Sequence, residues 1–356
     1  MRYDLALVGF GHVGRRFARL LEERAGCLAH QCALETRIVG ICTRRHGTAR
    51  NAAGIDGGRA AGLVEAGHRL DLVDAPDGFP APPATGVEFI EQLAAVTRAP
   101  LTGRLVVVET TLLDIAAGQP AIDHVRAALR AGAHVVTANK GPVAFAYADL
   151  RARARAANRA FLFEGAVMDG IPVFNLARTT LPAVSIRGFR GVVNSTTNYI
   201  ITAMEHGREL AESLTEMQVA GIAEADASLD VDGWDAAAKA AALANVLLEG
   251  RLTPQEVERT GIGGLTGAAV REAAARGRRI KLVASGTRRG EGVTARVAPE
   301  ELPAGDLLAT LRDQQNALVL DTDLLGEFSI VQLGGGLTQT AYALLSDLVA
   351  LAAREG

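Results

Sequence analysis

The chain has 356 residues, of which 49% are apolar and 22% are charged, and this composition excludes a disordered or collagen-like protein. Its length is sufficient for about two ordinary domains. The formal net charge of −3 gives no electrostatic reason to expect a nucleic-acid or anionic-membrane partner. No apolar run approaches the ~18 residues that span a bilayer, so we expect no membrane span, and we expect no signal peptide before the first strand-like segment.

Two scarce residue types are informative. The three cysteines are odd in number and lack CxxC spacing, which indicates reduced thiols in a cytoplasmic protein: Cys27, Cys32 and Cys42. Only three of the 37 basic residues are lysines: Lys140, Lys239 and Lys281. Because Lys can release a proton and Arg cannot, each lysine is a candidate for acid–base chemistry, with chance as the alternative.

The first part of the chain alternates apolar strand-like runs with helical patterns, which is typical of a doubly wound parallel sheet. The expected strands are 4–9, 37–42, 105–108 and 134–136, and the helix with the clearest pattern is 121–132. We therefore expect a Rossmann-type nucleotide-binding domain over residues 1–145, completed by the C-terminal segment 332–356.

After about residue 145 the pattern changes to mixed strands and helices. The expected strands are 161–163, 184–186, 188–193, 293–297, 316–320 and 328–331. The expected helices are 198–206, 215–220, 234–249 and, last in the chain, 339–353. The fold class is thus α/β, with a mixed α+β second domain over residues 146–331.

A glycine fingerprint, Gly-Phe-Gly-His-Val-Gly, follows the first strand and opens a helix. In this context Gly9 permits a tight turn, Gly11 lets the backbone approach a pyrophosphate, and Gly14 lets the helix pack closely on the strand. The amide groups of the helix N-terminus then face the phosphates. The alternative is a glycine-rich turn that binds no ligand.

An acidic segment, 221–239, contains five acids and one of the three lysines. Asp232-Gly233 predicts a turn and the alanine-rich run after it predicts a helix, so Asp235 and Lys239 are expected one turn apart on one face. Glu224 and Asp230 are expected on the loop that leads into this helix. Taken alone, the segment also fits an ordinary charged helix surface.

Three other stretches carry motifs. They are Val-Thr-Ala-Asn-Lys at 136–140, Glu-Gly-Ala-Val-Met-Asp-Gly-Ile-Pro at 164–172 and Gly-Val-Val-Asn-Ser-Thr-Thr-Asn-Tyr-Ile at 191–200. Together with the glycine fingerprint and the acidic segment, they resemble the motifs of the homoserine dehydrogenase family in order and spacing. The resemblance extends over nearly the whole chain.

The resemblance implies an enzyme that interconverts L-homoserine and L-aspartate 4-semialdehyde with NAD(P), a step toward threonine, methionine and isoleucine. It implies Lys239 as the acid/base, which neutralises charge on the aldehyde oxygen, with Asp235 holding the Lys239 ammonium and the substrate hydroxyl. Glu224 matches the residue that receives the substrate ammonium group, and Asp230 is expected to support the same pocket. Lys140, after a strand end, is a rival for the acid role.

The resemblance also implies sites for a cofactor and an ion. The expected cofactor contacts are Gly9, Phe10, Gly11, Val13, Gly14, Arg44, Thr110, Lys140, Gly221 and Gly336. The turn at 164–172 is similar to a monovalent-cation loop of the family, for Na⁺ or K⁺. The expected ligands are Glu164 and the carbonyl groups of Val167, Asp169 and Ile171, since oxygen donors suit hard cations. The alternative is a purely structural turn.

The second strand bears on cofactor choice. NAD-selective Rossmann sites place an acid at the end of this strand, and here the strand ends in Thr43-Arg44-Arg45. Because guanidinium groups bind a 2′-phosphate, we expect a preference for NADP(H) with some use of NAD(H). The alternative is that Arg44 and Arg45 belong to an arginine-rich surface.

The alternative functions are a related amino-acid or semialdehyde dehydrogenase and a nucleotide-binding sensor that keeps the fold without turnover. The resemblance implies a homodimer formed through the second domain. Some members of the family carry an appended small-ligand domain. Because little follows the predicted helix at 339–353, we expect no such domain here and no feedback through it.

Overall fold

The computed structural model describes residues 1–74, 79–97, 104–219, 227–290 and 292–355. The chain divides into two compact units. Unit 1 comprises Met1–Pro142, Ala146–Asn175 and Gly336–Gly356, and unit 2 comprises Val143–Phe145 and Leu176–Gly335. The boundary expected after residue 145 therefore lies near residue 175, because most of the intervening chain belongs to unit 1.

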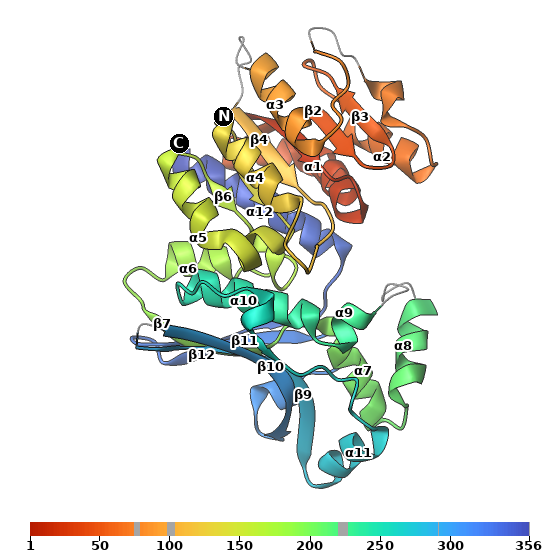
Figure 1. Ribbon diagram of the computed structural model, residues 1–356, viewed down its shortest axis with the longest axis vertical. Helices are drawn as coiled ribbons and strands as arrows, with labels where there is room; N and C mark the ends of the chain where they lie inside the picture. The colour runs from red at the N-terminus through yellow and green to blue at the C-terminus, as the bar shows by residue number, and fades with distance from the viewer. Residues whose placement is uncertain (75–78, 98–103, 220–226, 291, 356) are drawn as a thin grey trace. The chain divides into compact units, whose positions relative to one another are not determined.

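Unit 1 contains a six-stranded sheet in the order β3-β2-β1-β4-β5-β6, parallel except for β3 (Figure 1). The strands are β1 (Arg2–Val8), β2 (Glu35–Thr43), β3 (Gly47–Arg50), β4 (Arg104–Glu109), β5 (His134–Thr137) and β6 (Phe161–Leu162). The sequence interpretation assigned the run 161–163 to the second domain. It is instead the edge strand of the first sheet, where Val135 pairs with Phe161.

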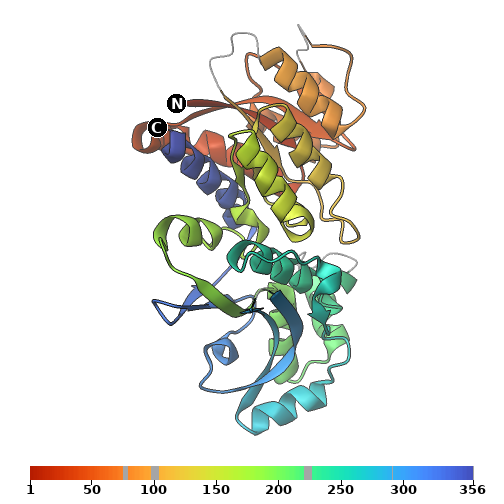
Figure 2. The ribbon, with the colours of Figure 1, turned by 60° about the vertical axis from the view of Figure 1, so that its left-hand side comes forward.

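Helices cover both faces of this sheet, with α1 and α12 on one face and α3 and α4 on the other (Figures 1 and 2). The helices of unit 1 are α1 (His12–Cys32), α2 (Gly57–Glu65), α3 (Gly86–Thr97), α4 (Ala121–Arg130), α5 (Gly141–Ala156) and α12 (Leu337–Glu355), with 3₁₀ turns η1 (Leu70–Val73) and η2 (Glu164–Ala166). Helix α6 (Phe174–Thr180) begins in unit 1 and continues into unit 2. Buried side chains of β1, α1 and α12 form one core cluster, including Leu7, Phe17 and Leu348. The C-terminal helix thus completes the fold of the N-terminal domain.

Unit 2 is built on a second sheet in the order β12-β11-β7-β9-β10-β8, antiparallel except for the pair β10–β8. The strands are β7 (Ile186–Val192), β8 (Glu258–Arg259), β9 (Arg278–Arg289), β10 (Gly292–Pro303), β11 (Asn316–Thr322) and β12 (Glu327–Gln332). The sequence interpretation missed β9 because arginines at both ends conceal its apolar centre, in which Leu282 and Val283 are buried.

The helices of unit 2 include α10, whose alanine-rich sequence lets it pack closely on the sheet at β9 and β10. They are α7 (Ser195–Glu205), α8 (Leu210–Val219), α9 (Ser228–Val231), α10 (Trp234–Leu247) and α11 (Gly267–Ala275), with 3₁₀ turns η3 (Pro254–Glu256) and η4 (Leu307–Thr310). Within the described parts of the chain, no helix has both the length and the apolar character needed to cross a membrane.

A polar clamp fastens the end of α12 to the sheet of unit 1. The Glu355 carboxylate accepts a hydrogen bond of 2.6 Å from the Tyr3 hydroxyl and forms an ion pair with Arg104. His134 Nε2 lies 3.4 Å from the same carboxylate, and His134 Nδ1 accepts the Ala160 N–H at 3.0 Å. Burial lowers the pKa of His134 to about 4, so this ring is neutral at pH 7.

The buried, neutral His134 ring predicts that the folded protein loses stability at acidic pH. Between pH 6.5 and about 4 the unfolded chain binds a proton at His134 and the folded chain does not, so the free energy of unfolding falls as the pH drops through this window. The contribution is on the order of 1–3 kcal/mol. We expect His134→Gln to show a shallower loss of stability over this window in denaturant titrations, while exposed His30→Gln keeps the wild-type slope. Equal slopes for wild type and His134→Gln would contradict the prediction.

Candidate active site

The carboxyl ends of four strands meet at one edge of the parallel sheet of unit 1. Val8 pairs with Cys42 on one side and Glu109 on the other, and Glu109 pairs with Thr137. The loops that follow these strands therefore begin side by side. Ligands of doubly wound folds bind at this edge.

The turn between β1 and α1 shows a different environment for each fingerprint glycine. Gly9 has φ 89°, and a Cβ there would lie 2.7 Å from the Thr110 carbonyl. A Cβ at Gly14 would lie 2.9 Å from the Gly9 carbonyl oxygen, so both glycines are required for close packing. At Gly11, by contrast, a Cβ would meet no atom within 4 Å. Gly11 is also the N-cap of α1 and makes no side-chain cap, so the helix N-terminus has room for an anion.

The other expected cofactor residues of unit 1 lie around the same edge. Thr110 Oγ1 donates to the Gly9 carbonyl at 2.9 Å, which ties the β4 loop to the fingerprint turn. Phe10 is buried, and its carbonyl accepts a hydrogen bond from Arg15 at 3.0 Å. Val13 is half-buried on the first turn of α1. Gly336 precedes α12, where Thr338 accepts a hydrogen bond from Arg16 of α1 at 3.0 Å.

Arg44 is an exposed residue just beyond the end of β2. The Gly9 N–H donates to the Cys42 carbonyl at 2.9 Å, so the chain segment that carries Arg44 starts next to the fingerprint turn. Burial raises the pKa of the Cys42 thiol to about 11, which favours the protonated thiol over the thiolate.

A buried network joins the loops after β4 and β5. Glu109 is fully buried, and its carboxylate accepts hydrogen bonds of 3.0 Å from the Thr111 N–H and the Thr137 hydroxyl. Asn139 donates to the Thr111 carbonyl at 3.0 Å and accepts the Gly141 N–H at 2.9 Å. Lys140, between these two residues, is the half-buried N-cap residue of α5. The motif at 136–140 thus fixes the backbone from which Lys140 extends.

The acidic cluster lies in unit 2, where α9 and α10 meet the start of α7. Lys239 Nζ lies 2.9 Å from the Asp235 carboxylate, one helical turn earlier, and donates to the Val193 carbonyl at 2.8 Å. The Asp235 and Lys239 side chains are only 16% and 17% exposed, so both are mostly buried but keep some contact with solvent. Asp230 lies on the short helix α9, and not on a loop as the sequence interpretation had it.

Asn194 contacts both Asp230 and Asp235. The sequence interpretation assigned no role to this residue. Its Nδ2 donates to Asp230 at 2.6 Å and to Asp235 at 2.9 Å. The available signal was its place in the motif 191–200, immediately before a predicted helix. Its contacts with α9 and α10 can be recognised only from the tertiary structure, because these helices lie far from Asn194 in the sequence.

The turn at 164–172 is built tightly against the start of α12. Met168 and Asp169 have positive φ angles of 54° and 53°, and a Cβ at Gly170 would lie 2.1 Å from the Gln339 carbonyl oxygen. The buried Glu164 carboxylate accepts the N–H groups of Val173 at 2.6 Å and Phe174 at 3.0 Å. This carboxylate therefore caps α6.

Two expected site residues, Gly221 and Glu224, lie outside the described residues. No cluster of three or more His, Cys, Asp or Glu side chains suited to a metal ion occurs in the parts of the chain that the structure describes.

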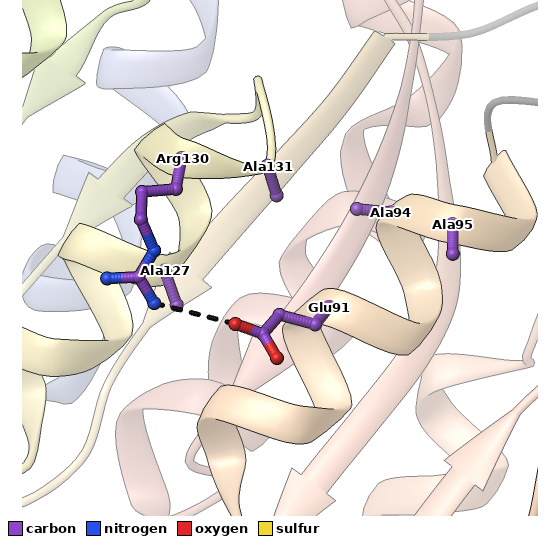
Figure 3. A pocket seen from close by; sticks show the side chains of 6 residues that line it. All are labelled: Glu91, Ala94, Ala95, Ala127, Arg130 and Ala131. Atoms are coloured by element: carbon purple, nitrogen blue, oxygen red, sulfur yellow. Dashed lines mark hydrogen bonds and ion pairs between the residues drawn. The ribbon is translucent and has the colours of Figure 1, made fainter.

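Unit 1 also has a surface depression that lies away from the fingerprint turn (Figure 3). It lies between the C-terminal halves of α3 and α4, and an ion pair of 3.4 Å between Glu91 and Arg130 crosses it. The rest of its lining is alanine: Ala94, Ala95, Ala127 and Ala131. Because helices run antiparallel to the strands that they connect, their C-terminal ends lie at the opposite edge of the sheet from the fingerprint turn.

Comparison with known proteins identifies the family of the chain. A family model for the NAD-binding domain of homoserine dehydrogenase matches residues 9–164, and a model for homoserine dehydrogenase matches residues 172–349. The chain is 38% identical to the NAD(+)-dependent homoserine dehydrogenase of Pseudomonas canavaninivorans, over 98% of this chain and 95% of that protein.

Solved structures give the same result. The crystal structure of a putative homoserine dehydrogenase from Archaeoglobus fulgidus matches with a TM-score of 0.82 and 28% identity, covering 98% of this chain and 99% of that one. A hyperthermophilic archaeal homoserine dehydrogenase in complex with NADPH matches with a TM-score of 0.79 and 27% identity, over 99% and 98% of the two chains. The chain belongs to the homoserine dehydrogenase family and is an NAD(P)-dependent oxidoreductase that acts on a CH–OH group.

Proposed function

We propose that Lys239 is the acid/base of the interconversion of L-homoserine and L-aspartate 4-semialdehyde. The observation that supports this role is its ammonium group, which the Asp235 carboxylate and the Val193 carbonyl hold in a partly exposed position. Both contacts accept hydrogen bonds from the charged lysine, so they orient Nζ.

The proton balance follows from this arrangement. Bound NAD(P) supplies or accepts the hydride at the carbon that carries the substrate oxygen. During aldehyde reduction negative charge develops on this oxygen, and an N–H of Lys239 donates the proton that completes the hydroxyl group. In the oxidative direction the neutral amine of Lys239 removes the hydroxyl proton. After aldehyde reduction the neutral amine of Lys239 regains a proton from solvent, and in the oxidative direction the proton that it took from the hydroxyl leaves to solvent. Asp235 favours the ammonium form in this exchange.

Substrate binding is assigned to the acids of the same segment. Glu224 is proposed to receive the substrate ammonium group, and Asp230 to support the pocket. The hydrogen bond of 2.6 Å from Asn194 to Asp230 favours a fixed carboxylate beside Asp235. A fixed anion suits the positively charged ammonium group of the substrate.

Cofactor binding is assigned to the fingerprint turn. The open space at Gly11 and the uncapped N-terminus of α1 fit a pyrophosphate, which the amide groups of this turn would hold. We place Arg44 at the 2′-position of the adenosine ribose and propose a preference for NADP(H). A relative named for NAD(+) dependence and a similar structure with NADPH show that the family includes both.

Three further assignments complete the proposal. A Na⁺ or K⁺ ion would be held in the turn at 164–171, by Glu164 and the carbonyl groups of Val167, Asp169 and Ile171. The chain is proposed to form a homodimer through unit 2, where apolar side chains are exposed near the edge strand β12: Leu324, Leu325, Val331 and Leu333. The molecular mass in solution tests this assignment. The free thiols are consistent with a cytoplasmic location.

The first prediction concerns Lys239→Arg. Arginine retains the positive charge beside Asp235 but cannot release a proton, so we expect folding and cofactor binding to persist while kcat falls by roughly 10²–10⁴. The measurement is the change in nicotinamide absorbance with homoserine. Lys140→Arg is the matched variant. Turnover of Lys239→Arg within a few-fold of wild type, with loss in Lys140→Arg, would assign the acid role to Lys140.

The second prediction concerns Glu224→Gln, which removes a charge but keeps the size of the side chain. We expect KM for homoserine to rise about 10-fold or more while kcat changes less, because a charged partner of the substrate ammonium group is lost. Glu216→Gln on α8 serves as a control with unchanged KM. An unaltered KM with lost turnover would show that Glu224 acts in the chemical step.

The third prediction concerns cofactor choice. We expect wild-type kcat/KM to be higher with NADP(H), and Arg44→Asp to shift the ratio toward NAD(H) by about 10-fold or more, since a carboxylate repels the 2′-phosphate and accepts the ribose hydroxyl. Arg24→Asp, the same change about 20 Å along α1 from its N-terminus, is the control. A wild-type preference for NAD(H), or a ratio unchanged by Arg44→Asp, would assign Arg44 to the general surface.

A further inference from the structure

Asn194 connects three elements of unit 2 through a single amide group. Its side chain is 4% exposed and lies at the start of α7. We infer that Asn194 is a positioning residue, which holds the Asp230 and Asp235 carboxylates so that Asp235 presents Lys239 in the reactive orientation. This inference rests on the proposed role of Lys239 as the acid/base.

The orientation of the amide follows from its neighbours. Oδ1 accepts the Thr197 N–H at 2.8 Å, which is the N-cap interaction of α7. Nδ2 therefore faces the opposite way, and its two hydrogens serve two acceptors, Asp230 at 2.6 Å and Asp235 at 2.9 Å. The amide oxygen and both amide hydrogens of Asn194 therefore each have a hydrogen-bond partner.

The same short segment holds both partners of the catalytic pair. Lys239 Nζ donates to the carbonyl of Val193, and Asn194, the next residue, donates to the carboxylate of Asp235. Since Asp235 Oδ2 receives both the Asn194 amide and the Lys239 ammonium, a shift of Asn194 moves the carboxylate that orients Nζ. The amide also lies between two carboxylates that would otherwise repel each other.

The base of this arrangement is anchored in the sheet. Asn198, one turn after Asn194, accepts a hydrogen bond of 2.9 Å from Lys281 and donates to the Gln315 carbonyl at 3.0 Å. Lys281 is completely buried on β9 and also donates to the Leu311 carbonyl at 2.7 Å. The first turn of α7 is thus fixed to a strand, so that Asn194 is a rigid support for the two acids.

Helix capping alone does not account for the residue type. Ser and Asp cap helices as well as Asn does, because capping requires only an acceptor. Neither can replace two N–H donors that point at two carboxylates. This difference separates the capping role from the positioning role in an experiment.

The test uses the full-length enzyme with Asn194→Asp and Asn194→Ser, which keep a cap acceptor and lose the amide donors. We expect kcat for homoserine to fall roughly 10- to 100-fold in both, with cofactor binding and melting temperature near wild type. In Asn194→Asp the acid limb of the kcat–pH profile should move up by about one unit, since a third carboxylate makes protonation of the cluster easier.

Two controls make the outcome decisive. Thr266→Ala removes the N-cap of α11 and should lower the melting temperature without altering the kcat–pH profile. Lys239→Arg in the same assay tests the proposed function separately. If Lys239→Arg is inactive while both Asn194 variants keep wild-type kcat and pH dependence, the inference is overturned and the acid/base assignment stands. If Asn194→Ser does not fold, Asn194→Asp decides, and a lowered melting temperature with an unchanged profile in that variant would reduce Asn194 to a helix cap.

Discussion

The parallel register of the sheet in unit 1 is the constraint on which the nucleotide site depends. Because Cys42, Val8, Glu109 and Thr137 occupy neighbouring positions on four strands, the loops after them begin at one edge. Hydrogen bonds then join these loops directly, from Thr110 to the Gly9 carbonyl and through the Glu109 carboxylate. The buried Glu109 network makes the loops part of the core and not separate surface segments.

The return of the chain at α12 is the second structural requirement of this unit. The Asp347 carboxylate of α12 accepts the Glu164 N–H at 2.8 Å and the Asn175 side-chain amide at 2.9 Å. Both contacts are buried, so the turn at 164–172, which joins β6 to α6, is shaped by a helix about 170 residues later in the chain. The tight approach of Gly170 to Gln339 has the same origin. The glycine at position 170 is therefore explained by packing against α12.

Local patterns in the sequence were sufficient for the parallel strands, the fingerprint turn and the Asp235–Lys239 pair, because each depends on the period of a single element. Patterns were insufficient where the partner is distant in sequence. The sequence pattern places the β6 run in the second domain, whereas its pairing with β5 puts it in the first sheet, and the arginine-rich ends of β9 conceal a central strand. Asn194 is the corresponding case in the site, since its donors face residues 36 and 41 positions later.

The three lysines show how far composition can be used as evidence for chemistry. Scarcity of lysine singled out Lys281 as strongly as Lys239, yet their surroundings differ. Lys281 is fully buried, and burial lowers its pKa to about 8, but its ammonium group is engaged by Asn198 and the Leu311 carbonyl within the core. Lys239 has a carboxylate partner one turn away and remains partly exposed. Solvent exposure, which a sequence does not display, therefore distinguishes Lys281, which is engaged within the core, from Lys239, for which the acid/base role is proposed.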